Sequence, residues 1–93
     1  MHYLYIIYSE TIRKYYVGET PNVEIRLIQH NTHHFKTNFT KVANDWKISL
    51  KCPCQNRAEA LFLEKFIKRM KSKVFIEKVI KNSEILSDIL KSK

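Results

Sequence analysis

Glu64 is the residue whose position most suggests chemistry. In a helical segment its neighbours at i−4, i−3 and i+3 are Ala60, Leu61 and Ile67, so the carboxylate lies on or beside an apolar stripe. Carboxylates are seldom buried without a partner. Glu64 is therefore either an ion-pair partner of Lys68, four residues on, or a ligand for a hard cation. Mg²⁺ accepts one or two carboxylates and completes its shell with water and substrate phosphates.

Basic residues gather in the same part of the chain. With 17 Lys+Arg against 9 Asp+Glu, the formal net charge is +8. A basic run is usually a solvated face, but here it coincides with the overall charge excess and favours contacts with phosphates. The residues concerned lie on or between two late helical segments: Lys65, Lys68, Arg69, Lys71, Lys73, Lys78 and Lys81.

Four other side chains could converge beside a sheet. Tyr5 and Tyr16 lie in two strand-like runs, and they share a face if the loop between the runs has an even number of residues. Arg26 and His30 are four residues apart in a helical segment and so project from one face of it. That segment follows Gly18, which permits close backbone approach. The alternatives are that the tyrosines are ordinary strand aromatics and that Arg26 and His30 are solvated.

The elements that must position these residues are two strands, a helix, a third strand and then helices. Aromatic and β-branched runs favour strands, Thr20 and Pro21 have the pattern of an N-cap followed by proline, and Asn56 opens a capping box. Pro53 is expected to end the third strand. The predicted strands are 3–8, 14–19 and 46–52, and the predicted helices are 21–31, 57–70, 73–81 and 84–90, with a short helix around 36–42. The long helix is expected to bury its apolar residues Leu61, Phe62, Phe66, Ile67 and Met70. This is an α+β class, in which helices pack on a small sheet whose third strand can join either edge of the hairpin.

Length and composition limit the class of protein. A chain of 93 residues forms one domain, and 44% hydrophobic residues exclude a disordered tail. Cys52 and Cys54 form neither a disulfide framework nor a four-ligand zinc site. No stretch approaches the roughly 18 apolar residues of a membrane span. We therefore expect a soluble, cytoplasmic domain, and the positive charge favours a polyanionic partner.

Five short motifs stand in an order that is specific when they are taken together. The first two are YLY at 3–5 and YVG at 16–18, and the third is TPNVEIRLIQHN at 20–31. The last two are FTK at 39–41 followed by Trp46, and RAEA at 57–60 followed by Glu64. In these motifs the chain resembles the GIY-YIG nuclease superfamily, particularly its small stand-alone branch related to the N-terminal nuclease domain of an excinuclease. The resemblance covers about residues 3–82.

The resemblance implies a fold and an activity. The fold is a three-stranded antiparallel sheet flanked by helices, which gives a nuclease domain over 1–82. The C-terminal helical tail over 83–93 lies outside the resemblance. The activity is Mg²⁺- or Mn²⁺-dependent endonucleolytic cleavage of DNA phosphodiesters, with a role in DNA repair or recombination. The alternatives are a nucleic-acid-binding module of the same fold without useful turnover and, ranked last, a basic domain whose partner is another protein.

The resemblance also assigns roles. Tyr5 and Tyr16 match the motif tyrosines, one of which is the general base, with Tyr16 favoured slightly. Arg26 matches the active-site arginine, whose donor fork could bind the phosphate, His30 matches the associated histidine, and Glu64 matches the metal ligand. For a tyrosine to act as base, a nearby cation or the metal must lower its pKa, or His30 must help to relay the proton. The residues expected to contact DNA are Arg26, Lys65, Lys68, Arg69, Lys71 and Lys73.

Overall fold

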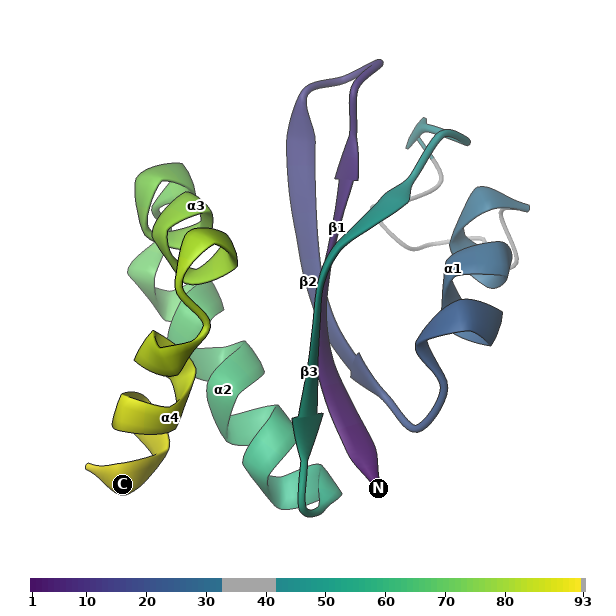
Figure 1. The fold of residues 1–93 in the computed structure, drawn as a ribbon. Helices are drawn as coiled ribbons and strands as arrows, with labels where there is room; N and C mark the ends of the chain where they lie inside the picture. Colours follow the sequence, from purple (N-terminus) through teal and green to yellow (C-terminus); the bar gives the residue numbers. More distant parts are fainter. Residues whose placement is uncertain (33–41, 93) are drawn as a thin grey trace.

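The computed structural model describes residues 1–32 and 42–92, and within them a three-stranded antiparallel sheet carries helices on both faces (Figure 1). The predicted α+β class is confirmed. The elements in chain order are β1 (His2–Ser9), β2 (Lys14–Thr20), α1 (Val23–Asn31), β3 (Lys47–Cys54), α2 (Arg57–Met70), α3 (Lys73–Lys81) and α4 (Glu84–Lys91). Helix α1 covers one face of the sheet, and α2, α3 and α4 cover the other (Figure 1).

Strand β1 is the centre of the sheet, whose order is β2-β1-β3. It pairs antiparallel with both neighbours, so the third strand joins the free edge of β1 rather than that of β2. Because helices cover both faces, successive β1 residues are buried in alternate directions. Leu4 and Ile6 enter the core on the side of α2, and Tyr5 and Ile7 enter the core on the side of α1.

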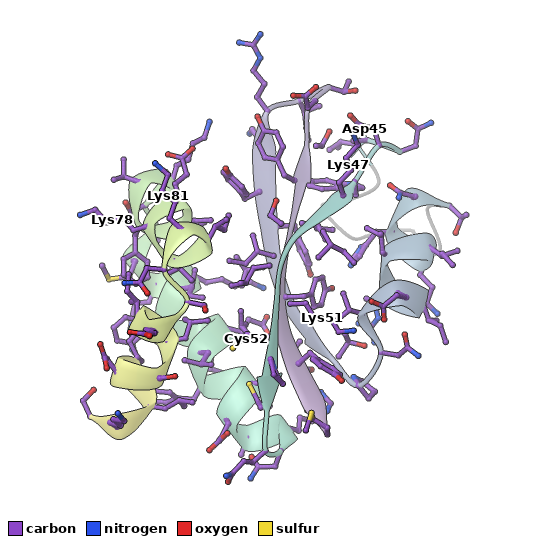
Figure 2. The ribbon with its side chains drawn as sticks, viewed as in Figure 1. Asp45, Lys47, Lys51, Cys52, Lys78 and Lys81 are labelled. Atoms are coloured by element: carbon purple, nitrogen blue, oxygen red, sulfur yellow. The ribbon has the colours of Figure 1, made fainter. Side chains whose placement is uncertain are left out.

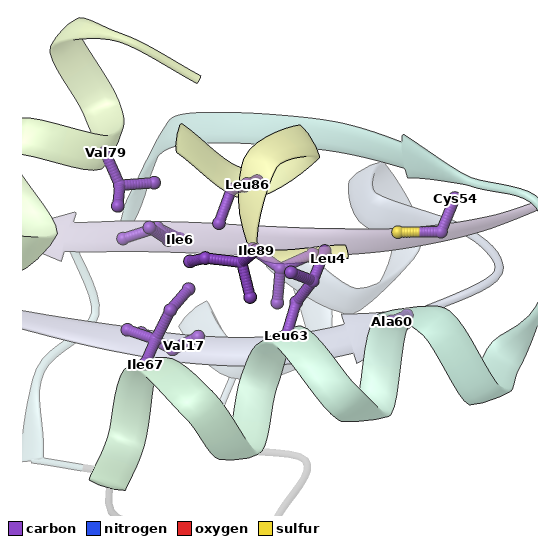
Figure 3. Packing of buried hydrophobic residues seen from close by; sticks show 10 residues of the cluster. All are labelled: Leu4, Ile6, Val17, Cys54, Ala60, Leu63, Ile67, Val79, Leu86 and Ile89. Atoms are coloured by element: carbon purple, nitrogen blue, oxygen red, sulfur yellow. The ribbon is translucent and has the colours of Figure 1, made fainter. Parts of the chain in front are cut away.

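The larger core lies between the sheet and the three late helices (Figure 3). Helix α2 contributes Ala60, Leu63 and Ile67, which stand one turn apart on a single face. The sequence-based prediction for this helix is partly wrong, because Leu63 is 0% exposed and Met70 is 47% exposed. Met70 is the last residue of the helix, and its place in the apolar pattern does not bury it there. The remaining buried members of this cluster are Leu4, Ile6, Val17, Cys54, Val79, Leu86 and Ile89, the last two from α4.

The smaller core lies under α1. Val23 and Trp46 are buried there against Tyr5 and Ile7. Asn31, the last residue of α1, donates its side-chain amide to the Trp46 carbonyl (3.0 Å) and accepts from the Trp46 N–H (2.7 Å). This pair of bonds fixes the end of α1 to the chain that enters β3.

The hairpin that joins β1 and β2 is held by Asp45, which precedes β3 (Figure 2). Its carboxylate accepts from the Ser9 hydroxyl (2.5 Å) and from the N–H and hydroxyl of Thr11 (3.0 and 2.9 Å). These bonds lower the pKa of Asp45. These bonds tie the end of β1 and the start of the turn to the segment that leads into β3.

Two helix starts show how far local signals predict the structure. Thr20 is not an N-cap: it is the last residue of β2, and Asn22 caps α1 by accepting from the Ile25 N–H (3.0 Å). The reason is that Pro21 follows the strand directly, and the Thr20 hydroxyl bonds Asn22 instead. The Asn56 cap of α2 is confirmed, with its oxygen 2.9 Å from the Glu59 nitrogen.

The prediction that Pro53 ends the third strand is wrong, because β3 continues to Cys54. Strand β3 is an edge strand, so a residue without an N–H can sit in it with its nitrogen facing away from the ladder. The helix predicted around 36–42 and the FTK motif at 39–41 lie wholly or almost wholly outside the described residues. None of the helices in the described part of the chain is long and apolar enough to cross a membrane.

Candidate active site

Tyr5, Tyr16 and His30 form a cluster of rings, in which Tyr5 and His30 are buried and Tyr16 is half-buried. The turn between β1 and β2 has four residues, 10–13, so the two tyrosines share a face as an even loop predicts. Tyr5 pairs with Gly18, and Tyr16 pairs with Ile7, two residues along β1. The ring centroids of the tyrosines are 6.5 Å apart, and the His30 ring lies 5.9 Å from Tyr5 and 5.1 Å from Tyr16.

A hydrogen bond of 2.7 Å joins the Tyr5 oxygen to His30 Nε2. Burial, with the positive charge of Arg26, lowers the pKa of His30 to about 4, so the imidazole is neutral at pH 7. Burial and the neighbouring Tyr16 raise the pKa of Tyr5 above its usual value. Because Tyr5 stays protonated and His30 stays neutral at pH 7, this hydrogen bond joins a neutral phenol to a neutral imidazole.

Arg26 brings a positive charge to this cluster. It lies one helical turn before His30 on α1 and is half-buried. Its guanidinium lowers the pKa of Tyr5 by its charge and by a hydrogen bond to the phenol, although burial outweighs both effects. The Tyr5 oxygen is therefore hydrogen-bonded to both Arg26 and His30, which holds all three side chains in one arrangement.

Gly18 makes room for the Tyr5 ring. A Cβ atom placed on Gly18 would lie 2.6 Å from the Tyr5 oxygen and 2.7 Å from the ring carbon that bears it. Real Cβ atoms do not approach other heavy atoms this closely. The sequence predicts a close approach at Gly18, and it is the side chain of Tyr5, the residue paired with Gly18 across the strands, that makes it.

Glu64 reaches the same cluster from α2. Its negative charge raises the pKa of Tyr5, and its side chain is 18% exposed. The carboxylate is paired with Lys68 Nζ at 2.7 Å, which is the ion pair that the i,i+4 spacing predicted. Lys68 Nζ also lies 5.2 Å from the centre of the Tyr16 ring. The two halves of the site are therefore linked through Lys68 and Tyr16.

A divalent metal would find one carboxylate at this site. The described residues contain no group of three His, Cys, Asp or Glu side chains that could form a protein cage for a cation. A single half-buried glutamate fits the donor set of Mg²⁺, which keeps several waters and uses substrate phosphates as further ligands. Glu64 could therefore hold a metal that is shared between protein and substrate. In this structure its carboxylate forms the ion pair with Lys68 instead.

The basic residues between 65 and 73 that are predicted to contact DNA separate into two groups. Lys68, Lys71 and Lys73 line a hollow of about 430 Å³ beside Tyr16. Lys65 and Arg69 do not line it, and Arg69 lies over the Phe66 ring at 5.7 Å. We call this hollow the basic groove.

Two residues of the basic groove were not predicted from the sequence. Arg13, the last residue of the hairpin turn, and Lys14, the first residue of β2, line it together with the three lysines. A signal was available, since two adjacent basic residues stand where the strand that carries Tyr16 begins. What the sequence did not show is that the hairpin turn and the α2–α3 junction meet in space.

Residues 1–82 match the family model of the GIY-YIG catalytic domain. The match includes all three strands, α1, α2 and α3, and every residue of the ring cluster, and it stops before α4. Searches of curated proteins and of solved structures give no match.

Proposed function

Because the chain belongs to the GIY-YIG family, whose domains are nucleases acting on DNA, we propose that it is a divalent-metal-dependent DNA endonuclease. The observation that supports this most is a convergence across the sheet. Arg26 and His30 come from the helix on one face and Glu64 comes from a helix on the other, and all three act on Tyr5. A purely structural cluster would not require a charged residue from each side.

Arg26 is proposed to bind the scissile phosphate. Its guanidinium offers several N–H donors in a planar fork that matches phosphate oxygens. One of these donors already bonds the Tyr5 oxygen, which holds the guanidinium in place. The other N–H groups of the same guanidinium are the ones proposed to bind the phosphate. Stabilising the charge that develops on the phosphoryl oxygens is the largest contribution that such a residue makes to hydrolysis.

Tyr16 is proposed to be the general base. Tyr5 is a poor candidate, because burial raises its pKa and its oxygen is already hydrogen-bonded to His30. Tyr16 is only half-buried, and Lys68 lies over its ring. In this arrangement Tyr5 and His30 hold Arg26 and the Tyr16 ring in place.

Glu64 is proposed to hold the metal, Mg²⁺ or Mn²⁺. When bound, such a cation supplies positive charge at the scissile phosphate and at the leaving oxygen. Lys68 would then have to leave its ion pair with Glu64. Its Nζ would then remain beside the Tyr16 ring, so a positive charge stays at this part of the site. A role in DNA repair or recombination and a cytoplasmic location stay predictions.

One observation favours a second function, that of a nucleic-acid-binding module without turnover. The carboxylate of Glu64 is already neutralised by Lys68 at 2.7 Å. If that ion pair persists when DNA binds, the site has a phosphate-binding arginine but no carboxylate for a metal. Binding would then be strongly salt-dependent and indifferent to divalent cations.

A cleavage assay tests the proposal. Supercoiled, single-stranded and branched DNA are incubated with Mg²⁺, Mn²⁺ or EDTA, using the wild type, Arg26→Ala and Glu64→Gln. Arg57→Ala and Glu84→Gln are matched controls, since both residues are exposed and lie outside the ring cluster. We expect metal-dependent nicking that falls by about 10²-fold or more in the two site variants, the loss typical when a transition-state-stabilising group is removed, and that persists in the controls. Cleavage that survives in Glu64→Gln would contradict the metal role, and binding without cleavage by every protein would establish the second function.

A further inference from the structure

The basic groove has a positively charged rim. Arg13 and Lys14 stand on the side of the hairpin turn, and Lys71 and Lys73 stand on the side of the α2–α3 junction. Lys68 joins the rim to Glu64. No aspartate or glutamate is among the described residues that line the groove. A site with this charge attracts an anion, and the nearest polyanion that the proposed function supplies is the phosphate backbone of DNA.

The interior of the groove is apolar. Val17 and Tyr16 come from the edge strand β2, and Ile67 and Ile76 come from α2 and α3. The volume of about 430 Å³ lies within the roughly 300–1,000 Å³ of sites that bind small organic molecules. A rim of cations around an apolar interior suits a ligand with an aromatic part and a phosphate, and it does not suit a free phosphate alone.

The backbone at the rim is unusual. Among the described residues other than glycine, only Arg13 and Lys71 have positive φ, at 53° and 49°. Both line the groove. Lys71 ends α2 at a position where glycine is the ordinary choice, because a side chain in the left-handed region costs free energy. Backbone strain of this kind clusters at ligand-binding sites, and here both strained residues carry a positive charge.

We propose that the basic groove binds one nucleotide of a DNA strand next to the bond that is cut, with the base in the apolar interior and the flanking phosphates on the rim. The inference rests on the proposed function and deepens it, because it specifies the substrate. A base that is stacked and paired in a duplex cannot enter a hollow, so the nucleotide must be unpaired. The protein therefore prefers single-stranded or branched DNA to intact duplex. The groove shares Tyr16 and Lys68 with the site, so the bound strand continues to Arg26 and Glu64.

Equilibrium binding in EDTA tests the inference without requiring cleavage. The probes are a fluorescently labelled oligothymidylate, an abasic strand with the same number of phosphates, and a blunt duplex of the same length. The rim variant is Lys71→Gln/Lys73→Gln. Its matched control is Lys47→Gln/Lys78→Gln, which removes the same charge from exposed positions on β3 and on α3, outside the groove (Figure 2).

We expect oligothymidylate to bind the wild type more tightly than the abasic strand by roughly 5- to 150-fold, the range for one stacked base. For the rim variant, the slope of log Kd against log salt should fall by about 1.4, which is two phosphate contacts on a single strand. The control variant should keep the wild-type slope. Equal loss in both variants, or equal binding of the abasic strand and oligothymidylate, would overturn the inference.

The same proteins separate this inference from the nuclease proposal. If binding is tight, depends on the base and uses the rim, but no metal-dependent cleavage occurs, the groove inference stands and the nuclease proposal is refuted. If the rim variant has the affinity and salt slope of the wild type and still cleaves DNA with metal, the nuclease proposal stands and the groove inference is refuted.

Discussion

Acid should destabilise the protein through His30. The side chain is 1% exposed, and burial together with Arg26 holds its pKa at about 4, against an ordinary value of 6.5 in the unfolded chain. Between these two values the unfolded chain binds more protons than the folded protein, so stability falls as the pH falls. The contribution is complete above pH 6.5 and is lost as the pH approaches 4. The groups facing His30 are two phenols, which stay neutral over this range, and Arg26, which stays charged.

The size of the effect follows from the two pKa values. Between pH 7 and pH 5, a single histidine with these values removes about 2 kcal/mol from the free energy of unfolding. For a domain of this length that is a fall in Tm of roughly 8–15 °C. Small domains are stable by only about 5–15 kcal/mol, so the loss is a large share of the total.

Urea unfolding at pH 7 and pH 5, followed by the fluorescence of the buried Trp46, measures the loss. The reference is His30→Gln, whose side-chain oxygen can accept the Tyr5 hydrogen bond but does not titrate. Glu24 and Asp45, whose pKa values are also lowered, contribute equally to both proteins and cancel in the difference. We expect the wild type to lose about 2 kcal/mol more than the variant. Equal losses would show that His30 is not held neutral and would refute the reasoning.

Three further substitutions test the packing that supports the site. Gly18→Ala places a Cβ 2.6 Å from the Tyr5 oxygen, so we expect a destabilisation of about 1–3 kcal/mol in urea and a loss of cleavage; unchanged values would mean that the ring moves freely. Leu63→Ala, at a fully buried position of α2, should cost about 2–5 kcal/mol in the same unfolding measurement. Met70→Ala, on the same helix but 47% exposed, should change the unfolding free energy by less than about 0.5 kcal/mol, and a larger loss would restore the sequence-based interpretation of that residue.

The sequence predicted most of the fold because its local signals agree with the packing. The Asn56 cap, the end of α1 at Asn31 and the two aromatic strands each have a short-range cause that the structure retains. The errors arose where tertiary context decides. Pro53 fits within β3 because no strand of the described chain pairs beyond it, and Met70 is exposed at the C-terminal end of α2 although it continues the apolar pattern.

The candidate site divides in the same way. An even hairpin loop and an i,i+4 spacing were enough to place Tyr5 with Tyr16 and Arg26 with His30. The pattern around Glu64 allowed two roles for its carboxylate, an ion pair with Lys68 and a metal ligand. The sequence could not decide between them, because the presence of Lys68 explains the ion pair but does not exclude the metal. The basic groove could not be predicted from the sequence. Arg13 and Lys71 are 58 positions apart (71 − 13), and they come to line one groove only through the packing of the late helices on the sheet.

The position of the site follows from how the two layers of helices are offset. Helix α1 packs against β1 and β3, whereas α2 packs mainly against β2 and β1 and only to a lesser extent against β3. On the face of α1, the edge strand β2 is therefore left partly uncovered, and Tyr16 is half-buried there while Tyr5 on the central strand is fully buried. On the other face, α2 lies close enough to the same edge for Lys68 to extend over the Tyr16 ring. Residues from opposite faces of a sheet can meet only at an edge, and in this fold β2 is the edge where they do. A substrate must therefore approach along β2, where the basic groove lies.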